Sequence, residues 1–371
     1  MLQSETPPFR ADQVGSLLRP QRLIDARYRH GSLDAKELRE LEDDCIREVI
    51  AFQERLGLKG VTDGEYRRHS WRSSFDGTVD GLVHRPARAE INICGHVDMG
   101  DFIMDASPFT EGRIRRRSGI VADEFRFLQS ATKQTPKITL PAPSFLHFFR
   151  GQDAIDRRVY PDLATYFVDI ARVYVEEVKA LEELGARYIQ FDEVPIAMIS
   201  DAGVRARMVQ SGLDPDGTID LYLSLLNAVI ASAGPDTTTT VHFCRGNSYG
   251  KSAGGGSFEP IAEAVFGGIQ ADALFIEFDE PEEQDFSPLR FVAKDKKVVL
   301  GLISTKIAAL EDRDKLKGRI DQASKYVPLE RLCISPQCGF SSRDKGTGLS
   351  IMDQTAKLDL LVSVAGSVWG S

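Results

Sequence analysis

Short apolar runs alternate along the chain with longer segments in which apolar residues recur every three or four positions. Several of the runs are almost continuously apolar, as expected of parallel strands that are buried on both faces. Eight cycles of strand and helix can be counted, and this number predicts a closed (β/α)8 barrel rather than an open sheet. The predicted strands are Asp12–Gly15, Leu58–Thr62, Lys137–Leu140, Tyr188–Phe191, Thr238–Phe243, Ala273–Ile276, Lys297–Leu302 and Arg331–Ile334.

The segments between the strands carry signals for helix ends. Asp34 and Glu37 form a D-x-x-E start, and Gly57 supplies a stop. Residues Tyr166–Leu184 and Gln354–Val368 have the same helical spacing of apolar positions. The stripe that follows Asp34 consists of Leu38, Leu41, Cys45, Val49, Phe52 and Leu56.

Residues 70–135 do not have the spacing of a single helix, because six glycines interrupt short alternating segments there. We interpret this stretch as a β-rich insertion between the second and third strands, in the form of a hairpin that could act as a lid. Nothing in the composition separates a second domain. The chain is therefore expected to form one barrel domain over residues 1–371, with residues 70–135 as an insertion within it.

Composition excludes several classes of function. A formal charge of −9 and a pI near 5.3 argue against binding to nucleic acid or anionic membrane surfaces. No apolar run is long enough to span a bilayer, and the first residues lack the pattern of a secretion signal. Five cysteines, an odd number, fit reduced thiols in the cytoplasm better than a disulfide framework. The pattern leaves open whether copies of the chain associate into a homo-oligomer.

The strongest chemical signal is VHFC at residues 241–244, at the end of the fifth predicted strand. Positions two apart on a strand point to the same side, so His242 and Cys244 face one spot. Imidazole and thiolate are preferred zinc ligands. The pair alone is weak evidence, because a buried histidine beside a core cysteine is common.

Two more residues strengthen the signal. Glu277 stands where the apolar run of the sixth strand should continue, and a buried carboxylate needs a partner. Cys338 follows the eighth strand in a loop with proline and glycine. The carboxyl ends of barrel strands meet at one mouth, so His242, Cys244, Glu277 and Cys338 are expected to bind one Zn²⁺ with tetrahedral geometry.

With these residues in place, the chain resembles the cobalamin-independent methionine synthase family in its short, single-barrel form. The resemblance covers nearly the whole sequence. It rests on RADQVGSLLRP, TDGEYRR, IQFDEVP, VHFC, FIEFDEP and ISPQCGFSSR. It implies a zinc-dependent methyltransferase of methionine biosynthesis, in which His242, Cys244, Glu277 and Cys338 hold the metal, homocysteine is the thiol substrate and a small molecule donates the methyl group.

The resemblance also implies where the amino-acid end of homocysteine binds. Gly15, Ser16, Glu65 and Asp192 occupy the positions that hold it in the family, and Asp192 is also a candidate catalytic residue. The residue types suit this task, since an ammonium group needs carboxylates and a carboxylate needs hydroxyl or backbone N–H donors.

The expected ligand set favours transfer to sulfur over hydrolysis. Two thiolates and one carboxylate would leave Zn²⁺ only modestly Lewis acidic, so a bound substrate sulfur keeps the electron density needed to attack an alkyl carbon. Hydrolytic zinc sites more often use neutral histidines and activate water.

The methyl donor is less well defined by the residues. Family members carry a tryptophan for the folate ring after the third strand, where this chain has Pro143, and a histidine acid after the seventh, where it has Lys306. A lysine with a lowered pKa could serve as the acid, so Lys306 is a second candidate catalytic residue. Methyltetrahydrofolate, a corrinoid or another methyl carrier all remain open as donors. Residues near the second and third strand ends that could line the donor's cavity are His69, Trp71, Arg72 and His147.

Three alternatives stay open. The related epoxyalkane:coenzyme M transferases keep such a zinc site and alkylate a different thiol. A relative of uroporphyrinogen decarboxylase would need no metal. A sensor barrel would bind a thiol amino acid without turning it over.

Overall fold

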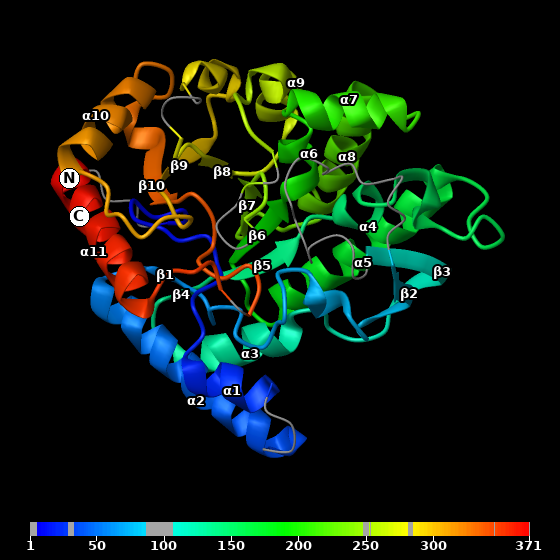
Figure 1. Cartoon of the computed structure of the whole chain (residues 1–371), viewed down its shortest axis with the longest axis horizontal. Coiled ribbons are helices and arrows are strands. Elements are labelled where there is room, and N and C mark those ends of the chain that lie inside the picture. The colour runs from blue at the N-terminus through cyan, green and yellow to red at the C-terminus, as the bar shows by residue number, and fades with distance from the viewer. Residues whose placement is uncertain are drawn as a thin grey trace.

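Parallel strands occupy the middle of the protein and helices lie around them (Figure 1). Six strands form one parallel sheet in the order β10-β9-β8-β7-β6-β5, so that neighbours along the chain are neighbours in the sheet. The strands are β5 (Ile138–Pro141), β6 (Tyr188–Glu193), β7 (Thr238–Phe243), β8 (Ala273–Glu277), β9 (Lys297–Ile303) and β10 (Leu332–Pro336). This computed structural model describes residues 6–28, 33–86, 107–247, 252, 254–280, 285–344 and 346–370.

The first two predicted strands connect the edges of this sheet. β1 (Gly60–Val61) pairs in parallel with β4 (Thr135–Pro136), which leads directly into β5. On the other side, the backbone N–H of Asp12 donates to the carbonyl oxygen of Ile334 in β10 at 3.0 Å. The strands thus follow one another in the order expected of a (β/α)8 barrel, and the predicted α/β class is confirmed.

These two strands are shorter than predicted, because side chains replace part of the backbone pairing between them. The first segment has only one bridge in the described ranges, from Ala11 to Ile334. Across the gap to β1, the Thr62 hydroxyl donates to the carbonyl oxygen of Gly15 at 2.7 Å and accepts from Gln13 Nε2 at 3.1 Å. The contacts that join the strands here come from polar side chains that the apolar pattern does not register.

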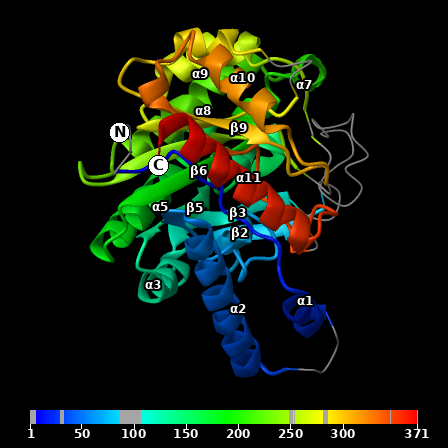
Figure 2. The same ribbon diagram turned by 90° about the vertical axis from the view of Figure 1, so that its left-hand side faces the viewer.

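The predicted helix ends agree with the structure. The Asp34 carboxylate accepts from the backbone N–H of Glu37, the Glu37 carboxylate accepts from that of Asp34, and Gly57 ends the helix with φ +88°. This long helix, α2, extends downward from the rest of the barrel (Figure 2). The α-helices are α1 (Gln21–Tyr28), α2 (Ala35–Leu56), α3 (Ala122–Ala131), α4 (Phe145–Phe148), α5 (Leu163–Glu183), α6 (Val194–Met198), α7 (Ala202–Gln210), α8 (Pro215–Ile230), α9 (Glu259–Gly268), α10 (Arg313–Ala323) and α11 (Ile351–Trp369).

The stretch predicted as a β-rich insertion contains an antiparallel hairpin. Its strands are β2 (Val79–Arg85) and β3 (Ser107–Arg116), which packs against α5. The same stretch also holds α3, the helix between β1 and β4. Residues 87–106 lie outside the described part of the chain, so the predicted lid stays a prediction. The same holds for the assignment of residues 1–371 to a single domain.

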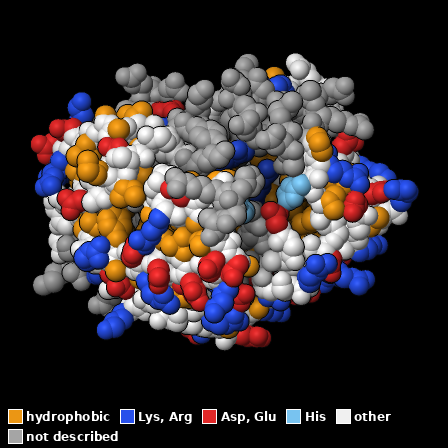
Figure 3. Space-filling model, turned by 60° about the horizontal axis from the view of Figure 1, so that its bottom comes forward, with side chains coloured by type: hydrophobic (Ala, Val, Ile, Leu, Met, Phe, Trp, Pro, Cys, Tyr) orange, Lys and Arg blue, Asp and Glu red, His pale blue; other side chains and the backbone are white. Residues whose placement is uncertain are grey.

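Two features of the surface bear on function. No helix in the described ranges is long and apolar enough to cross a bilayer. Acidic and basic side chains are interspersed over the face shown in Figure 3, without a broad region of one sign among its described residues.

A buried ion pair closes the barrel interior at the amino ends of the strands, opposite the predicted site. Lys137 Nζ lies 3.2 Å from Asp12 Oδ1, and both side chains are fully buried. The Tyr188 hydroxyl donates to Asp12 Oδ2 at 2.8 Å. The Nζ atom of Lys137 also lies 4.1 Å from the ring centre of Phe275, which belongs to a small cluster of buried apolar residues.

Lys137→Met should destabilise the protein strongly, because it leaves the Asp12 carboxylate buried without its cation. We expect the free energy of unfolding to fall by about 3–5 kcal/mol, as for other broken buried pairs. Urea denaturation followed by circular dichroism measures this change. The matched control is Lys36→Met, at a lysine side chain that is 85% exposed. A loss equal to that of the control would show that the ion pair has no structural role.

Candidate metal and substrate site

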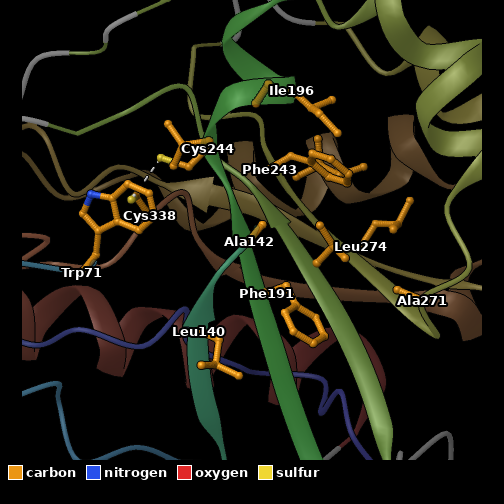
Figure 4. Packing of buried hydrophobic residues seen from close by; sticks show 14 of the residues in the cluster. Trp71, Leu140, Ala142, Phe191, Ile196, Phe243, Cys244, Ala271, Leu274 and Cys338 are labelled. Carbon is orange, nitrogen blue, oxygen red and sulfur yellow. Dashed lines mark hydrogen bonds between the residues drawn. The ribbon is translucent and has the colours of Figure 1, made fainter. Parts of the chain in front are cut away.

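Three of the four predicted metal ligands meet at the carboxyl ends of the strands. His242 lies in β7 and Cys244 follows it, while Cys338 comes from the loop after β10. Their ligand atoms all lie within 4.8 Å of one another, and all three side chains are buried. The two sulfurs are 3.2 Å apart, as the dashed line in Figure 4 shows. Both cysteines can therefore reach one ion.

The protonation of the two cysteines differs. The Cys244 thiol donates a hydrogen bond to Cys338 Sγ, which lowers the pKa of Cys338 to about 5. The same hydrogen bond, together with burial, raises the pKa of Cys244 well above the usual value. One proton is thus shared between two sulfurs, and the shared hydrogen bond favours the negative charge on Cys338.

His242 has the environment of a residue that awaits a ligand. Its side chain is buried, and neither ring nitrogen has a nitrogen or oxygen partner within the described part of the chain. Burial alone would lower the pKa of His242, but the neighbouring Cys338 sulfur outweighs it and raises the pKa. Buried polar atoms are normally satisfied, so a ring whose polar neighbour is a sulfur requires an explanation. An imidazole beside a thiolate and a thiol fits a metal ion of the zinc type, which prefers these donor atoms.

Glu277, the fourth predicted ligand, lies outside this cluster. It ends β8, where the pairing of Phe275 with His242 places it level with Cys244 on the neighbouring strand. Its Oε1 accepts from Lys306 Nζ at 3.1 Å and its Oε2 from the backbone N–H of Arg245 at 3.2 Å. The fully buried carboxylate is therefore adjacent to the sulfur pair but bound to a lysine.

Lys306 does not have the lowered pKa that its predicted role as a proton donor requires. It contacts Glu277 at 3.1 Å, Asp279 at 3.3 Å and Glu280 at 2.9 Å. Burial alone would lower the pKa of Lys306, but Glu277 and Asp279, together with the hydrogen bond to Glu280, outweigh it and raise the pKa. Sequence could not show this, because only the fold places three carboxylates around one ammonium group.

Three of the four predicted substrate residues line the same cavity, which has a volume of about 460 Å³ and is open to solvent. Ser16, Glu65 and Asp192 line it together with the histidine and the two cysteines. Gly15 lies just behind Glu65, since a Cβ added to Gly15 would stand 2.8 Å from Glu65 Oε1. A glycine is required here so that the backbone can approach this carboxylate.

The two carboxylates are held in place by neighbours. Glu65 Oε1 accepts from the Thr139 hydroxyl at 2.7 Å, and Glu65 is the one non-glycine residue with positive φ (59°) in the described ranges. Asp192 Oδ1 accepts from Gln190 Nε2 at 2.7 Å. Burial raises the pKa of Asp192 to about 7, so a bound cation would favour its ionised form.

Sequence reasoning named some lining residues and missed others. Trp71, one of four candidates near the second and third strand ends, lines the cavity, whereas His147 packs elsewhere with Nδ1 2.7 Å from the Tyr222 hydroxyl. Asn247 and Ser342 also line it and were not predicted. The only available signal for Asn247 was its place three residues after Cys244.

A parallel α/β barrel whose strand ends combine a thiol pair, a histidine and two buried carboxylates in one cavity has the arrangement of an enzyme that acts on a small molecule. The chain belongs to the cobalamin-independent synthase family: the model of its catalytic domain matches residues 15–366. Relatives in the family with a named activity are methyltransferases.

Individual relatives cover nearly the whole chain. The uncharacterised protein YxjG of Bacillus subtilis (strain 168) is 37% identical, over 99% of this chain and 97% of its own length. A solved Listeria monocytogenes structure, assigned as a vitamin-B12 independent methionine synthase, is 31% identical, covers 99% and 100% of the two chains and has a TM-score of 0.77. A B12-independent methionine synthase from Shewanella sp. W3-18-1, solved with selenomethionine, shares the fold at 22% identity, with 97% of each chain covered and a TM-score of 0.74.

Proposed function

We propose that this protein transfers a methyl group to the thiol of homocysteine, giving methionine, and that a zinc ion activates this thiol. The observation that carries the proposal is the shared cavity. In it, the sulfurs of Cys244 and Cys338 lie beside His242, while Glu65 and Asp192 line the same space. One group of residues suits a metal-bound sulfur and the other suits the ammonium group of an amino acid.

Three side chains support zinc as the metal. His242 offers ring nitrogens without a nitrogen or oxygen partner among the described residues, and the hydrogen bond from Cys244 lowers the pKa of Cys338. With Cys244 they would hold the ion, and Glu277 would be the fourth ligand in exchange for its contact with Lys306. When bound, zinc lowers the pKa of a coordinating thiol so that the sulfur is ionised at neutral pH.

The other residues bind and orient the substrate. The carboxylates of Glu65 and Asp192 would take the ammonium group, and the Ser16 hydroxyl would donate to the carboxylate of homocysteine. Because they line the same cavity as the sulfur pair, the side chain of the amino acid would extend toward the two sulfurs. Burial of these groups excludes water, so both ionic contacts gain strength. The Shewanella relative binds selenomethionine, which has the shape of the proposed product.

The direct test is product analysis by mass spectrometry. Zinc-loaded protein is incubated with homocysteine and, separately, with methyltetrahydrofolate, methylcobalamin or S-adenosylmethionine as donor. We expect methionine from at least one donor and none after metal removal. Coenzyme M in place of homocysteine tests the alternative thiol. If homocysteine binds but no donor yields methionine, or if the protein purified from zinc-containing medium holds no zinc, the proposed function is wrong.

Lys306→Met should tighten zinc binding rather than weaken it, because Lys306 competes with the metal for Glu277. Without this cation, the buried carboxylates of Glu277 and Asp279 repel each other and attract a metal more strongly. We expect an increase in zinc affinity of about tenfold, the scale of other changes around metal ligands. Competition with a chromophoric chelator measures it. Lys306→Arg keeps the charge and should leave affinity near that of the wild type; an unchanged or weaker affinity in Lys306→Met contradicts the competition.

A further inference from the structure

Arg68 is a buried cation to which the proposed function gives no role. It lies in the loop after β1, and its side chain is 1% exposed. Its Nη1 is 3.4 Å from Oε1 of Glu65, one of the carboxylates that line the cavity. A guanidinium in direct contact with Glu65 would cancel the negative charge that the ammonium group of an amino acid needs. The contacts of Arg68 therefore determine how much of this charge is available.

The short contacts of Arg68 to a carboxylate go to Glu124 instead. Arg68 Nε and Nη2 both donate to Glu124 Oε2, at 2.9 and 2.6 Å. Burial alone would lower the pKa of Arg68, but Glu124, followed by Glu65, outweighs it and raises the pKa. Glu124 is thus the main counterion of this guanidinium, and Glu65 is the weaker one.

A hydroxyl group connects Arg68 to Glu65. Arg68 Nη1 donates to Thr139 Oγ1 at 3.0 Å, and a guanidinium can only donate. The Thr139 hydroxyl must therefore accept from Arg68, and it donates its own proton to Glu65 Oε1 at 2.7 Å. No hydrogen bond to Glu65 Oε2 is found among the described residues. This second oxygen is left for a ligand of the cavity.

Glu124 comes from the stretch inserted between the second and third predicted strands. It lies in the first turn of α3, which contacts β4 and α5 (Figure 1). Glu124 is buried, but it is not among the described residues that line the cavity. It can therefore act on a substrate through Arg68 and Glu65, not by contact.

We propose that Glu124 is a positioning residue that binds Arg68 and so leaves Glu65 free to bind the ammonium group of an amino-acid substrate. This inference rests on the proposed function, because it concerns the recognition of homocysteine in the same cavity. Without the charge on Glu124, the guanidinium would pair with Glu65, which is already 3.4 Å away. The negative charge of Glu65 would then be neutralised within the protein. In this way the inserted stretch takes part in the choice of substrate.

Calorimetric titration of zinc-loaded protein with two thiols tests the role of Glu124. Homocysteine carries the ammonium group, and 4-mercaptobutanoate lacks it. Titration at about pH 8 keeps Glu124 mostly ionised, since burial raises its pKa to about 7 against the effect of Arg68. Glu124→Gln keeps the shape and removes the charge. It should weaken homocysteine binding about tenfold, less than the loss of a direct partner of the ammonium group. Binding of 4-mercaptobutanoate should be unchanged or tighter.

The matched control is Asp123→Asn, at the preceding residue of the same helix. The Asp123 side chain is 79% exposed and pairs with Arg126, so its replacement should change the binding of neither thiol.

Two further variants separate this role from a purely structural one. Arg68→Gln combined with Glu124→Gln removes the guanidinium that would neutralise Glu65, so this double variant should bind homocysteine more tightly than Glu124→Gln alone. General damage to the structure would make the double variant the weaker of the two. Thr139→Val removes the connecting hydroxyl but keeps the ion pair. It should show the same selective loss of homocysteine binding, and it tests the inference without removing a buried charge.

The outcomes separate this inference from the proposed function. If the wild type binds neither thiol, the proposed function fails. If the wild type prefers homocysteine and both Glu124→Gln and Thr139→Val keep that preference, Glu124 has no positioning role and the proposed function stands. The same conclusion follows if the double variant binds homocysteine more weakly than Glu124→Gln. Zinc content and thermal melting show that each variant is loaded and folded.

Discussion

Replacing Cys338 by serine is expected to abolish zinc binding and methyl transfer together. The pKa of Cys338 is the lowered one of the sulfur pair, whereas a serine hydroxyl stays protonated at neutral pH. We expect zinc affinity to fall by more than about 100-fold, since changes to groups that only support metal ligands already cost about 10- to 100-fold. Metal content after dialysis and methionine formation are measured on the same sample. Cys244→Ser should behave in the same way.

The matched control for this loss is Cys45→Ser. Cys45 is equally buried, but it lies in α2 and accepts a hydrogen bond from Arg22 Nε at 3.4 Å, which a hydroxyl can also accept. The control should keep both zinc and activity. A Cys338→Ser protein that stays active without zinc would remove the basis for a metal-activated thiol, whatever the control does.

Asp192→Asn should impair recognition of homocysteine while it leaves the metal in place. The variant keeps the shape of the side chain, and the oxygen of the new amide could still accept from Gln190, but the negative charge that faces the ammonium group is gone. Loss of one partner of a buried charge pair corresponds to a rise in KM for homocysteine of about 30-fold or more. Steady-state kinetics and zinc analysis of the variant check both parts of the expectation.

A thiol without an amino group separates recognition from chemistry. The compound 4-mercaptobutanoate is homocysteine without its ammonium group, so the wild type should strongly prefer homocysteine. Asp192→Asn should lose most of this preference. If the ratio of kcat/KM values for the two thiols is the same in both proteins, Asp192 does not bind the ammonium group. The same ratio of kcat/KM values, measured for Glu65→Gln, tests whether Glu65 binds the ammonium group.

The chain sequence by itself determined the elements and the identity of most site residues. Apolar runs marked the strands, and the capping pair of Asp34 and Glu37 marked the start of α2, because these signals are local. The period of two along β7 placed His242 and Cys244 on one side of the strand. The resemblance in six motifs then pointed to the cobalamin-independent methionine synthase family, which the matches over nearly the whole chain confirm.

The tertiary structure alone decided how distant residues combine. The sulfurs of Cys244 and Cys338 are 94 residues apart in sequence and 3.2 Å apart in space, a distance that no local pattern determines. The ring of carboxylates that raises the pKa of Lys306, and the hydrogen bond from Asn247 Nδ2 to the Thr305 hydroxyl, also depend on several loops at once. Periodicity shows which face of an element is apolar. Charge pairing, hydrogen-bond direction and burial depend on neighbours that only the folded chain brings together.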